Sequence, residues 1–77
     1  MSEKLKSVFI AALGLSTSTD VTALSYRGVA EWDSVAHMQL VAALEQAFDV
    51  MLETEDVIAL SSYTKAGEIL ARYGAKL

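Results

Sequence analysis

A chain of 77 residues without cysteine is long enough for one small domain, and it excludes a disulfide framework or a thiolate metal site. Hydrophobic residues make up 53% of the chain and charged residues 21%, which excludes a disordered protein and predicts a domain held together by apolar packing. The formal net charge of -4 argues against a nucleic-acid-binding protein, because phosphate binding needs clustered Lys and Arg.

The first predicted element is an amphipathic helix over residues 2–13. Its apolar residues recur at intervals of three and four, which places them on one stripe of a helix. They are Leu5, Val8, Phe9, Ala12 and Leu13. Gly14 follows, and a glycine at this place is a common helix end because it adopts the left-handed conformation at little steric cost.

A long connection over residues 14–32 comes next. The polar run over residues 16–20 has side chains that compete for backbone hydrogen bonds and so interrupts helical structure. A structureless loop of this length is unusual in a small domain, so we expect a short helical turn over residues 20–24 and apolar side chains that lie on the core. These side chains are Val21, Leu24, Tyr26, Val29 and Trp32.

The central helix is predicted over residues 34–48. This segment contains neither Gly nor Pro, and all of its residues are compatible with a helix. One broad face carries the apolar residues that we expect in the core. They are Leu40, Val41, Leu44, Ala47 and Phe48.

Two further helices are predicted towards the end of the chain. Thr54 is interpreted as the N-cap of a short helix that ends near Leu60, because two acidic residues follow it where the helix dipole favours negative charge. Ser61 and Ser62 are interpreted as caps of a last helix, which Gly74 ends. Its inward stripe consists of Ala66, Ile69, Leu70 and Tyr73.

Gly67 lies within this last helix and weakens it by about 1 kcal/mol relative to Ala, unless a neighbouring helix needs the space. The chain thus contains three longer predicted helices and one short one, with no strand signal. This pattern predicts an all-α fold, an antiparallel four-helix bundle, formed as a single domain by residues 1–77.

The sequence shows no sign of a membrane or secretory segment. No apolar run approaches the roughly 18 residues of a membrane span, and residues 1–6 lack the apolar stretch of a signal peptide. We therefore expect a cytoplasmic monomer that does not insert into membranes.

The acidic residues are concentrated in the middle of the chain. Residues 28–64 contain no Lys or Arg, and we call the acidic residues within them the acidic centre. They are Glu31, Asp33, Glu45, Asp49, Glu53, Glu55 and Asp56. Such a concentration serves either as a solvated surface that keeps the protein soluble or as a docking surface for basic partners. Within it, Glu53, Glu55 and Asp56 are too close together and too few for a calcium loop, which needs a Gly at its turn and a distant Glu, so no metal is expected.

Asp33 and Ser34 stand immediately before the central helix. A short polar side chain at this place is typical of a helix N-cap, which accepts hydrogen bonds from the first free backbone amides. The alternative is that Ser34 is a serine to which a group is attached, at the start of the second helix and after a long loop. The spacing alone does not decide between these two interpretations.

The run Asp33-Ser34-Val35 is similar to the attachment site of the acyl carrier and peptidyl carrier protein family, which reads Asp-Ser-Leu at the start of the second of four helices. The resemblance extends in order from Leu5 to Tyr73 and implies an acyl-carrier-protein-like bundle. The similar positions include Met38, Val41, Leu44, Glu45, Phe48, Asp49, Glu55, Asp56 and the run Leu60-Ser61-Ser62-Tyr63.

The resemblance implies that Ser34 accepts 4'-phosphopantetheine from coenzyme A, transferred by a separate phosphopantetheinyl transferase, with Asp33 in a supporting role. Acyl or aminoacyl groups would be held as thioesters on the cofactor, whose thiol is needed because the chain has no Cys. An acyl- or aminoacyl-activating ligase would load these groups, and downstream synthases or transferases would use them. The chain itself would not be an enzyme.

The chain departs from the family pattern at three places, one of which is the second helix, where only Glu45 and Asp49 are acidic and which is thus less acidic than in typical fatty-acid carriers. Val35 replaces the commoner Leu, and Glu31 and Trp32 stand where peptidyl carriers often have Gly-Gly. A start of Trp-Asp-Ser is more similar to stand-alone carriers that serve dedicated ligases or biosynthetic clusters. The identity of the carried group and the pathway stay open.

The outer face of the central helix also carries apolar residues. The helical period places Val35, Met38 and Ala42 away from the core stripe. The acidic residues Glu45 and Asp49 belong to the same face. These apolar residues are either scattered surface residues that need no explanation or, for a carrier, a contact strip rimmed by acids. We identify all five residues as candidates for partner docking.

His37 follows Ser34 by one helical turn, so a hydrolase dyad has to be considered. The chain lacks a Gly-x-Ser-x-Gly elbow, offers no acid placed to orient the imidazole, and is too short to enclose a substrate pocket. We expect His37 to be half-buried on the helix flank, without a catalytic role. The alternative to a carrier is then a small helical protein–protein interaction module with an acidic docking face and no prosthetic group.

Overall fold

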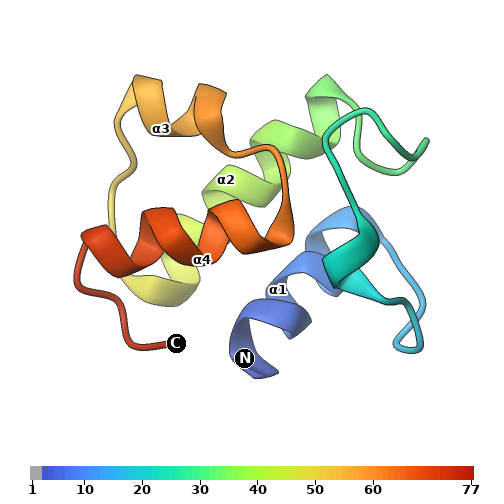
Figure 1. The fold of residues 1–77 in the computed structure, drawn as a ribbon, viewed down its shortest axis with the longest axis horizontal. Helices are drawn as coiled ribbons and strands as arrows, with labels where there is room; N and C mark the ends of the chain where they lie inside the picture. The colour runs from blue at the N-terminus through green and yellow to red at the C-terminus, as the bar shows by residue number, and fades with distance from the viewer. Residues whose placement is uncertain (1–2) are drawn as a thin grey trace.

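The computed structural model describes residues 3–77, and its regular structure is helical (Figure 1). The elements are α1 (Glu3–Leu13), the 3-10 helix η1 (Val21–Ala23), α2 (Ser34–Phe48), α3 (Thr54–Ala59) and α4 (Tyr63–Arg72). This range contains no strand, only an isolated bridge between Ser25 and Ser62. The predicted all-α class with three longer helices and one short helix is confirmed, and the arrangement is compatible with a small helical bundle. None of these helices combines the length and the apolar character that a membrane span requires.

α1 forms where the amphipathic stripe predicts it. The buried members of the stripe are Leu5, Phe9 and Leu13. The other two members are half-buried. Gly14 ends the helix with a φ of 65°, which is the left-handed conformation expected at a helix end. The predicted first residue of this helix, Ser2, lies outside the described residues.

The connection between α1 and α2 lies against the core, as predicted. Asp20 caps η1, because its carboxylate accepts a hydrogen bond from the amide of Thr22 at 3.1 Å. Leu24 follows as the C-cap, so the predicted turn over residues 20–24 is confirmed. Val21, Leu24 and Trp32 are buried, and Tyr26 and Val29 are half-buried.

α2 begins and ends at the predicted residues. Asp33 is its N-cap, and Asp49 is its C-cap with a left-handed φ of 54°. Of the predicted core face, Leu40, Val41 and Leu44 are buried, and Ala47 and Phe48 are half-buried. α2 makes its most extensive contact with α1.

α3 begins one residue earlier than the predicted cap requires. Its N-cap is Glu53 and not Thr54, which is the first helical residue. The carbonyl of Glu53 accepts hydrogen bonds from the amides of Asp56 and Val57 at 2.9 and 3.0 Å. These bonds form the first turn with Glu53 as its cap, so Thr54 is the first residue inside the helix.

α4 begins after Ser62, whose hydroxyl accepts a hydrogen bond from the amide of Lys65 at 3.1 Å. This predicted cap is confirmed. The prediction that Ser61 is also a cap is wrong, because Ser61 lies one residue before the N-cap. Its carbonyl accepts a hydrogen bond from the amide of Tyr26 at 2.9 Å. Gly74 follows the helix with a φ of 81°. The inward stripe agrees with the prediction: Ala66, Ile69 and Leu70 are buried and Tyr73 is half-buried.

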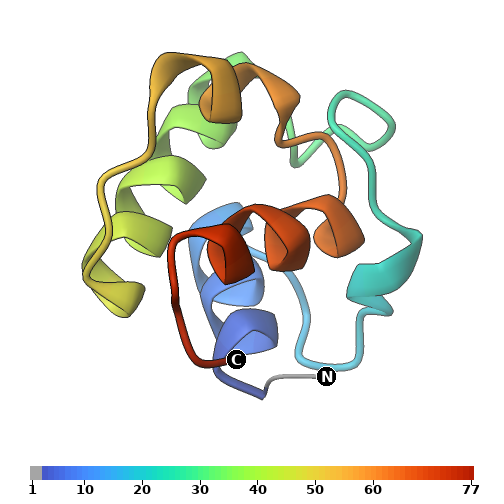
Figure 2. The ribbon, with the colours of Figure 1, turned by 60° about the vertical axis from the view of Figure 1, so that its left-hand side comes forward.

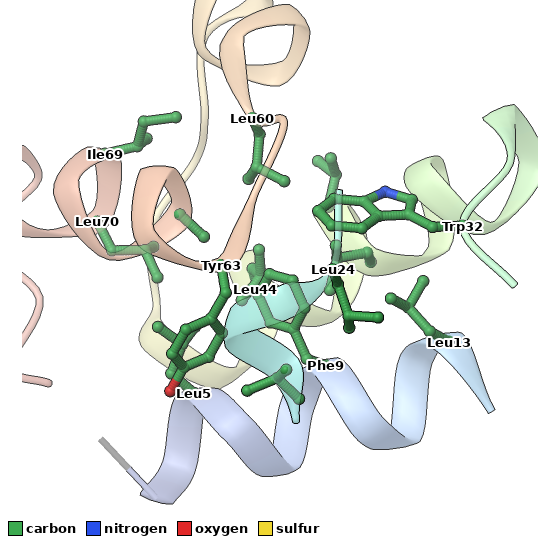
Figure 3. Packing of buried hydrophobic residues seen from close by; sticks show 14 of the residues in the cluster. Leu5, Phe9, Leu13, Leu24, Trp32, Leu44, Leu60, Tyr63, Ile69 and Leu70 are labelled. Carbon is green, nitrogen blue, oxygen red and sulfur yellow. The ribbon is translucent and has the colours of Figure 1, made fainter. Parts of the chain in front are cut away.

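The core is built around Phe9 of α1. Its ring makes edge-to-face contacts with Trp32, at 5.5 Å between centroids, and with Tyr63, at 5.2 Å. Aromatic rings favour this geometry, and Figure 3 shows the three rings among the aliphatic side chains of the core. Trp32 is 0% exposed, so the segment immediately before α2 is anchored in the core.

α3 stands apart from the main helix pair. Figure 1 and Figure 2 both show it at the opposite end of the molecule from α1. None of its six residues is fully buried. Val57 and Ala59 are half-buried and pack against the core.

Candidate functional site

Ser34 is the first residue of α2, and its side chain is exposed. Its hydroxyl makes no hydrogen bond within residues 3–77. The amides of the first turn of a helix lack carbonyl partners inside the helix, and the dipole gives this end a partial positive charge. The hydroxyl therefore lies beside backbone groups that favour an anion.

Asp33 holds the start of α2. Its Oδ1 accepts a hydrogen bond from the amide of Ala36 at 2.8 Å. Its carbonyl accepts another from the amide of His37 at 2.8 Å, and its backbone is extended, as an N-cap requires. The cap interpretation is thus confirmed for Asp33, and this cap leaves the side chain of Ser34 unused.

The loop before Asp33 is folded by its own backbone hydrogen bonds. The amide of Gly28 donates to the carbonyl of Ser25 at 2.9 Å, and the amide of Trp32 donates to the carbonyl of Val29 at 3.2 Å. Arg27 adopts a left-handed φ of 63° and donates its amide to the carbonyl of Trp32 at 2.8 Å. Together with the buried indole of Trp32, these bonds hold Ser34 at a defined place.

His37 is buried, so the prediction that it is half-buried is wrong. Its side chain is 7% exposed. The indole Nε1 of Trp32 donates to its Nδ1 at 2.9 Å, and its Nε2 lies 2.8 Å from the carbonyl oxygen of Val57. An indole N–H can only donate, so Nδ1 accepts and the proton of the neutral ring is on Nε2, which donates to Val57. Both ring nitrogens are engaged, and neither serves Ser34 as a base.

A signal in the sequence could have placed His37 correctly. Counting back from the buried face of α2, His37 precedes Leu40 by three residues and Val41 by four. These intervals put the imidazole on the same helical stripe as the core leucines. A histidine on a core stripe needs buried hydrogen-bond partners, which a sequence does not identify when they come from other elements.

An apolar groove of about 330 Å³ opens beside Ser34. Its lining joins the start of α2 to α3 and to the loop before α2. The lining residues are Tyr26, Ser34, His37, Met38, Val57 and Ile58. Ser34 and Met38 were predicted as site residues, whereas Val57 and Ile58 were not, because their proximity to Ser34 depends on the packing of α3.

The outer face of α2 is exposed, as predicted. Val35 is 67% exposed and Met38 is 56% exposed, and Ala42 is also exposed. Met38 belongs both to this face and to the groove. We call Val35, Met38 and Ala42 the contact strip.

The two acidic docking candidates differ in their surroundings. Glu45 is half-buried, and its Oε2 accepts a hydrogen bond from the amide of Leu52 at 2.9 Å, which fastens the loop after α2. Asp49 is exposed at the C-terminal end of α2. Of the two carboxylates, Asp49 is thus the one open to a partner.

Part of the acidic centre has a structural use. Asp56 accepts hydrogen bonds from the phenol of Tyr73 at 2.5 Å and from the guanidinium of Arg72 at 2.7 Å. The hydrogen bond from Tyr73, followed by that from Arg72, holds the pKa of Asp56 below its ordinary value. The remaining acids of the centre, apart from Glu45, are exposed.

Comparisons of the chain with protein-family models, with curated proteins and with solved structures find no match. Function therefore has to be inferred from the residues around Ser34. They combine an exposed nucleophilic hydroxyl at a helix N-terminus, an apolar groove and an exposed apolar strip. This combination suits the attachment of a group and its presentation to a visiting protein.

Proposed function

We propose that the chain is a carrier protein that holds acyl or aminoacyl intermediates on 4'-phosphopantetheine attached to Ser34. The observation that carries this proposal is the exposed hydroxyl of Ser34, free of hydrogen bonds within residues 3–77. Asp33, and not Ser34, caps α2. A serine that is spared from capping in an Asp-Ser-Val run resembling a carrier attachment site supports a role in modification.

The residues around Ser34 fit such a group. A phosphodiester on this hydroxyl would lie at the N-terminus of α2, where free amides and the helix dipole favour negative charge. When bound, the cofactor would supply the thiol for a thioester, which a chain without Cys cannot provide. The groove lined by Met38, Val57 and Ile58 offers apolar surface beside the attachment point.

Partner enzymes would bind through the contact strip. Val35 and Met38 expose apolar surface next to Ser34, and the exposed carboxylate of Asp49 lies at the far end of the same helix. Small apolar contacts give modest affinity, and surrounding charges steer a basic partner. This arrangement suits a protein that visits a transferase, a ligase and downstream enzymes in turn.

The decisive experiment modifies the purified chain. Wild-type protein is incubated with coenzyme A and a broad-specificity phosphopantetheinyl transferase, and intact mass and free thiol are recorded. We expect a mass increase of one phosphopantetheine and one thiol per chain, since the unmodified chain has none. Ser34→Ala is expected to abolish both signals.

Ser61→Ala is the matched control, because Ser61 is another exposed serine next to a helix start. Its modification is expected to equal that of the wild type. An unchanged wild-type mass, with a transferase that modifies a known carrier in parallel, would contradict the proposal. The protein–protein interaction module would then be the remaining function.

A further inference from the structure

α3 forms one wall of the groove beside Ser34, and its apolar attachment to the core is partial, through the half-buried Val57 and Ala59. Val57 and Ile58 line the groove. Ile58 is nevertheless 78% exposed, and no residue of α3 is fully buried. An element with few buried apolar contacts opens locally at a low free energy. The polar contacts of α3 therefore add to this partial packing in holding the wall of the groove.

Side-chain hydrogen bonds attach α3 to the rest of the chain at both of its ends. In its first turn, Asp56 is bonded to Arg72 and Tyr73 at the end of α4. Near its end, Nε2 of His37 donates to the carbonyl of Val57 at 2.8 Å. The carbonyls of the last turn of a helix have no amide partner within the helix. His37 therefore satisfies a free carbonyl and ties the groove wall to α2.

His37 can donate to Val57 only when its proton is on Nε2, and Trp32 selects this tautomer. The indole N–H of Trp32 donates a hydrogen bond to Nδ1 of His37 at 2.9 Å. If Nδ1 carried the proton, two N–H donors would point at each other and this bond would be lost. The indole is 0% exposed and packs edge-on against Phe9. Because Trp32 is anchored in the core, its hydrogen bond keeps the proton of the neutral imidazole on Nε2, the nitrogen that faces α3.

We propose that Trp32 and His37 form a latch on α3: Trp32 fixes the tautomer of His37, and His37 holds the carbonyl of Val57. His37 is then a positioning residue for the groove beside Ser34. Breaking either link frees α3 locally, while α1, α2 and α4 stay folded. The latch belongs to the unmodified chain, so its test is independent of any group attached to Ser34.

Amide hydrogen exchange at neutral pH, resolved by residue, tests the latch in the full chain. His37→Leu removes both hydrogen bonds and keeps an apolar side chain of similar size. The amides of Val57 and Leu60, which donate to carbonyls at Glu53 and Asp56, are expected to exchange about tenfold faster relative to amides of α1. His37→Gln has an amide that can accept from Trp32 and donate to Val57, so it is expected to restore most of the protection.

Trp32→Phe tests the role of the tautomer, because Trp32 makes no hydrogen bond to α3. Protection of the α3 amides is expected to fall more than that of the α1 amides. The imidazole ¹⁵N spectrum of His37, the only histidine, is expected to change from a single Nε2–H tautomer to a mixture. An equal loss of protection in all helices of either variant, or an unchanged single tautomer in Trp32→Phe, would overturn the proposal.

Discussion

The phenol of Tyr73 donates a hydrogen bond to Asp56 at 2.5 Å and so joins the end of α4 to the first turn of α3. The same phenol accepts a hydrogen bond from the amide of Glu53 at 3.0 Å, the residue that caps α3. Arg72 adds its guanidinium to the carboxylate of Asp56. Tyr73, just beyond α4, thus binds the start of α3. His37 binds α3 near its other end.

The depressed pKa of Asp56 predicts a specific loss of stability in acid. The pKa of Asp56 in the folded state lies below its ordinary value of 3.8. The ionised carboxylate therefore stabilises the folded state at pH values above 3.8. This contribution is lost as the pH falls through the folded-state pKa. We expect the difference in Tm between wild type and Asp56→Asn to be largest above pH 5 and to shrink towards pH 2.

The control for this prediction is Glu55→Gln, which removes an exposed carboxylate from the same helix. Its Tm relative to the wild type is expected to change little over this range. Thermal unfolding followed by circular dichroism at several pH values makes the comparison. A constant Tm difference for Asp56→Asn from pH 2 to pH 7 would show that the ionised form of Asp56 is not the stabilising one.

The ends of α2 were predictable because the signals are local. Asp33 supplies a cap, the segment after it lacks Gly and Pro, and its apolar residues follow the helical period. The same local reasoning misplaced the cap of α3, where the backbone carbonyl of Glu53, and not a side chain, closes the first turn. A cap without a side-chain hydrogen bond leaves no mark in the sequence.

The candidate site was predictable only in its first residues. Ser34 and Met38 share one helix, so their exposure follows from helical geometry. The place of His37 on the core stripe indicates its burial, but its hydrogen-bond partners, Trp32 and Val57, belong to other elements, and Val57 lies 20 residues further along the chain. Contacts of this kind come from the packing of separate elements, and a single sequence carries no direct signal for them.

Gly67→Ala is expected to stabilise the protein by about 0.5–1 kcal/mol, because alanine has the higher helix propensity. A Cβ at this position would lie 3.7 Å from Cδ1 of Leu77 and 3.9 Å from Cδ2 of Leu5, which are ordinary contact distances. No neighbouring helix therefore requires a glycine at this position. Urea unfolding measures the change, and a loss of stability would show that this packing does not hold in solution.

Leu44→Ala is expected to lower the free energy of unfolding by about 2–5 kcal/mol. Leu44 is 0% exposed and belongs to the face of α2 that packs in the core. This loss is a large fraction of the stability of a small domain. Urea unfolding of this variant measures the loss. A decrease in the free energy of unfolding below about 1 kcal/mol would show that the core around Leu44 is less tightly packed than its burial indicates.

Asp49→Gly is expected to raise stability by about 1 kcal/mol, because Asp49 carries two local costs. It adopts a left-handed φ of 54° without being a glycine, and it places a negative charge at the negative end of the α2 dipole. If the acid is retained for docking, the more stable variant is expected to react more slowly with the phosphopantetheinyl transferase. Unfolding and transferase assays on the same preparation separate the two effects, and equal transferase rates would remove Asp49 from the docking surface.

Met38→Glu tests the contact strip directly. Met38 is 56% exposed and borders the groove next to Ser34, so a charge there is expected to leave the helical circular dichroism spectrum unchanged. The kcat/KM for modification of Ser34 is expected to fall about tenfold, which corresponds to about 1.4 kcal/mol of lost contact with the transferase. The matched control is Met51→Glu, since Met51 is 83% exposed but lies in the loop after α2, away from the groove lining. Equal rates for the two variants would mean that Met38 has no special part in docking, because the same charge change at either methionine would then have the same effect.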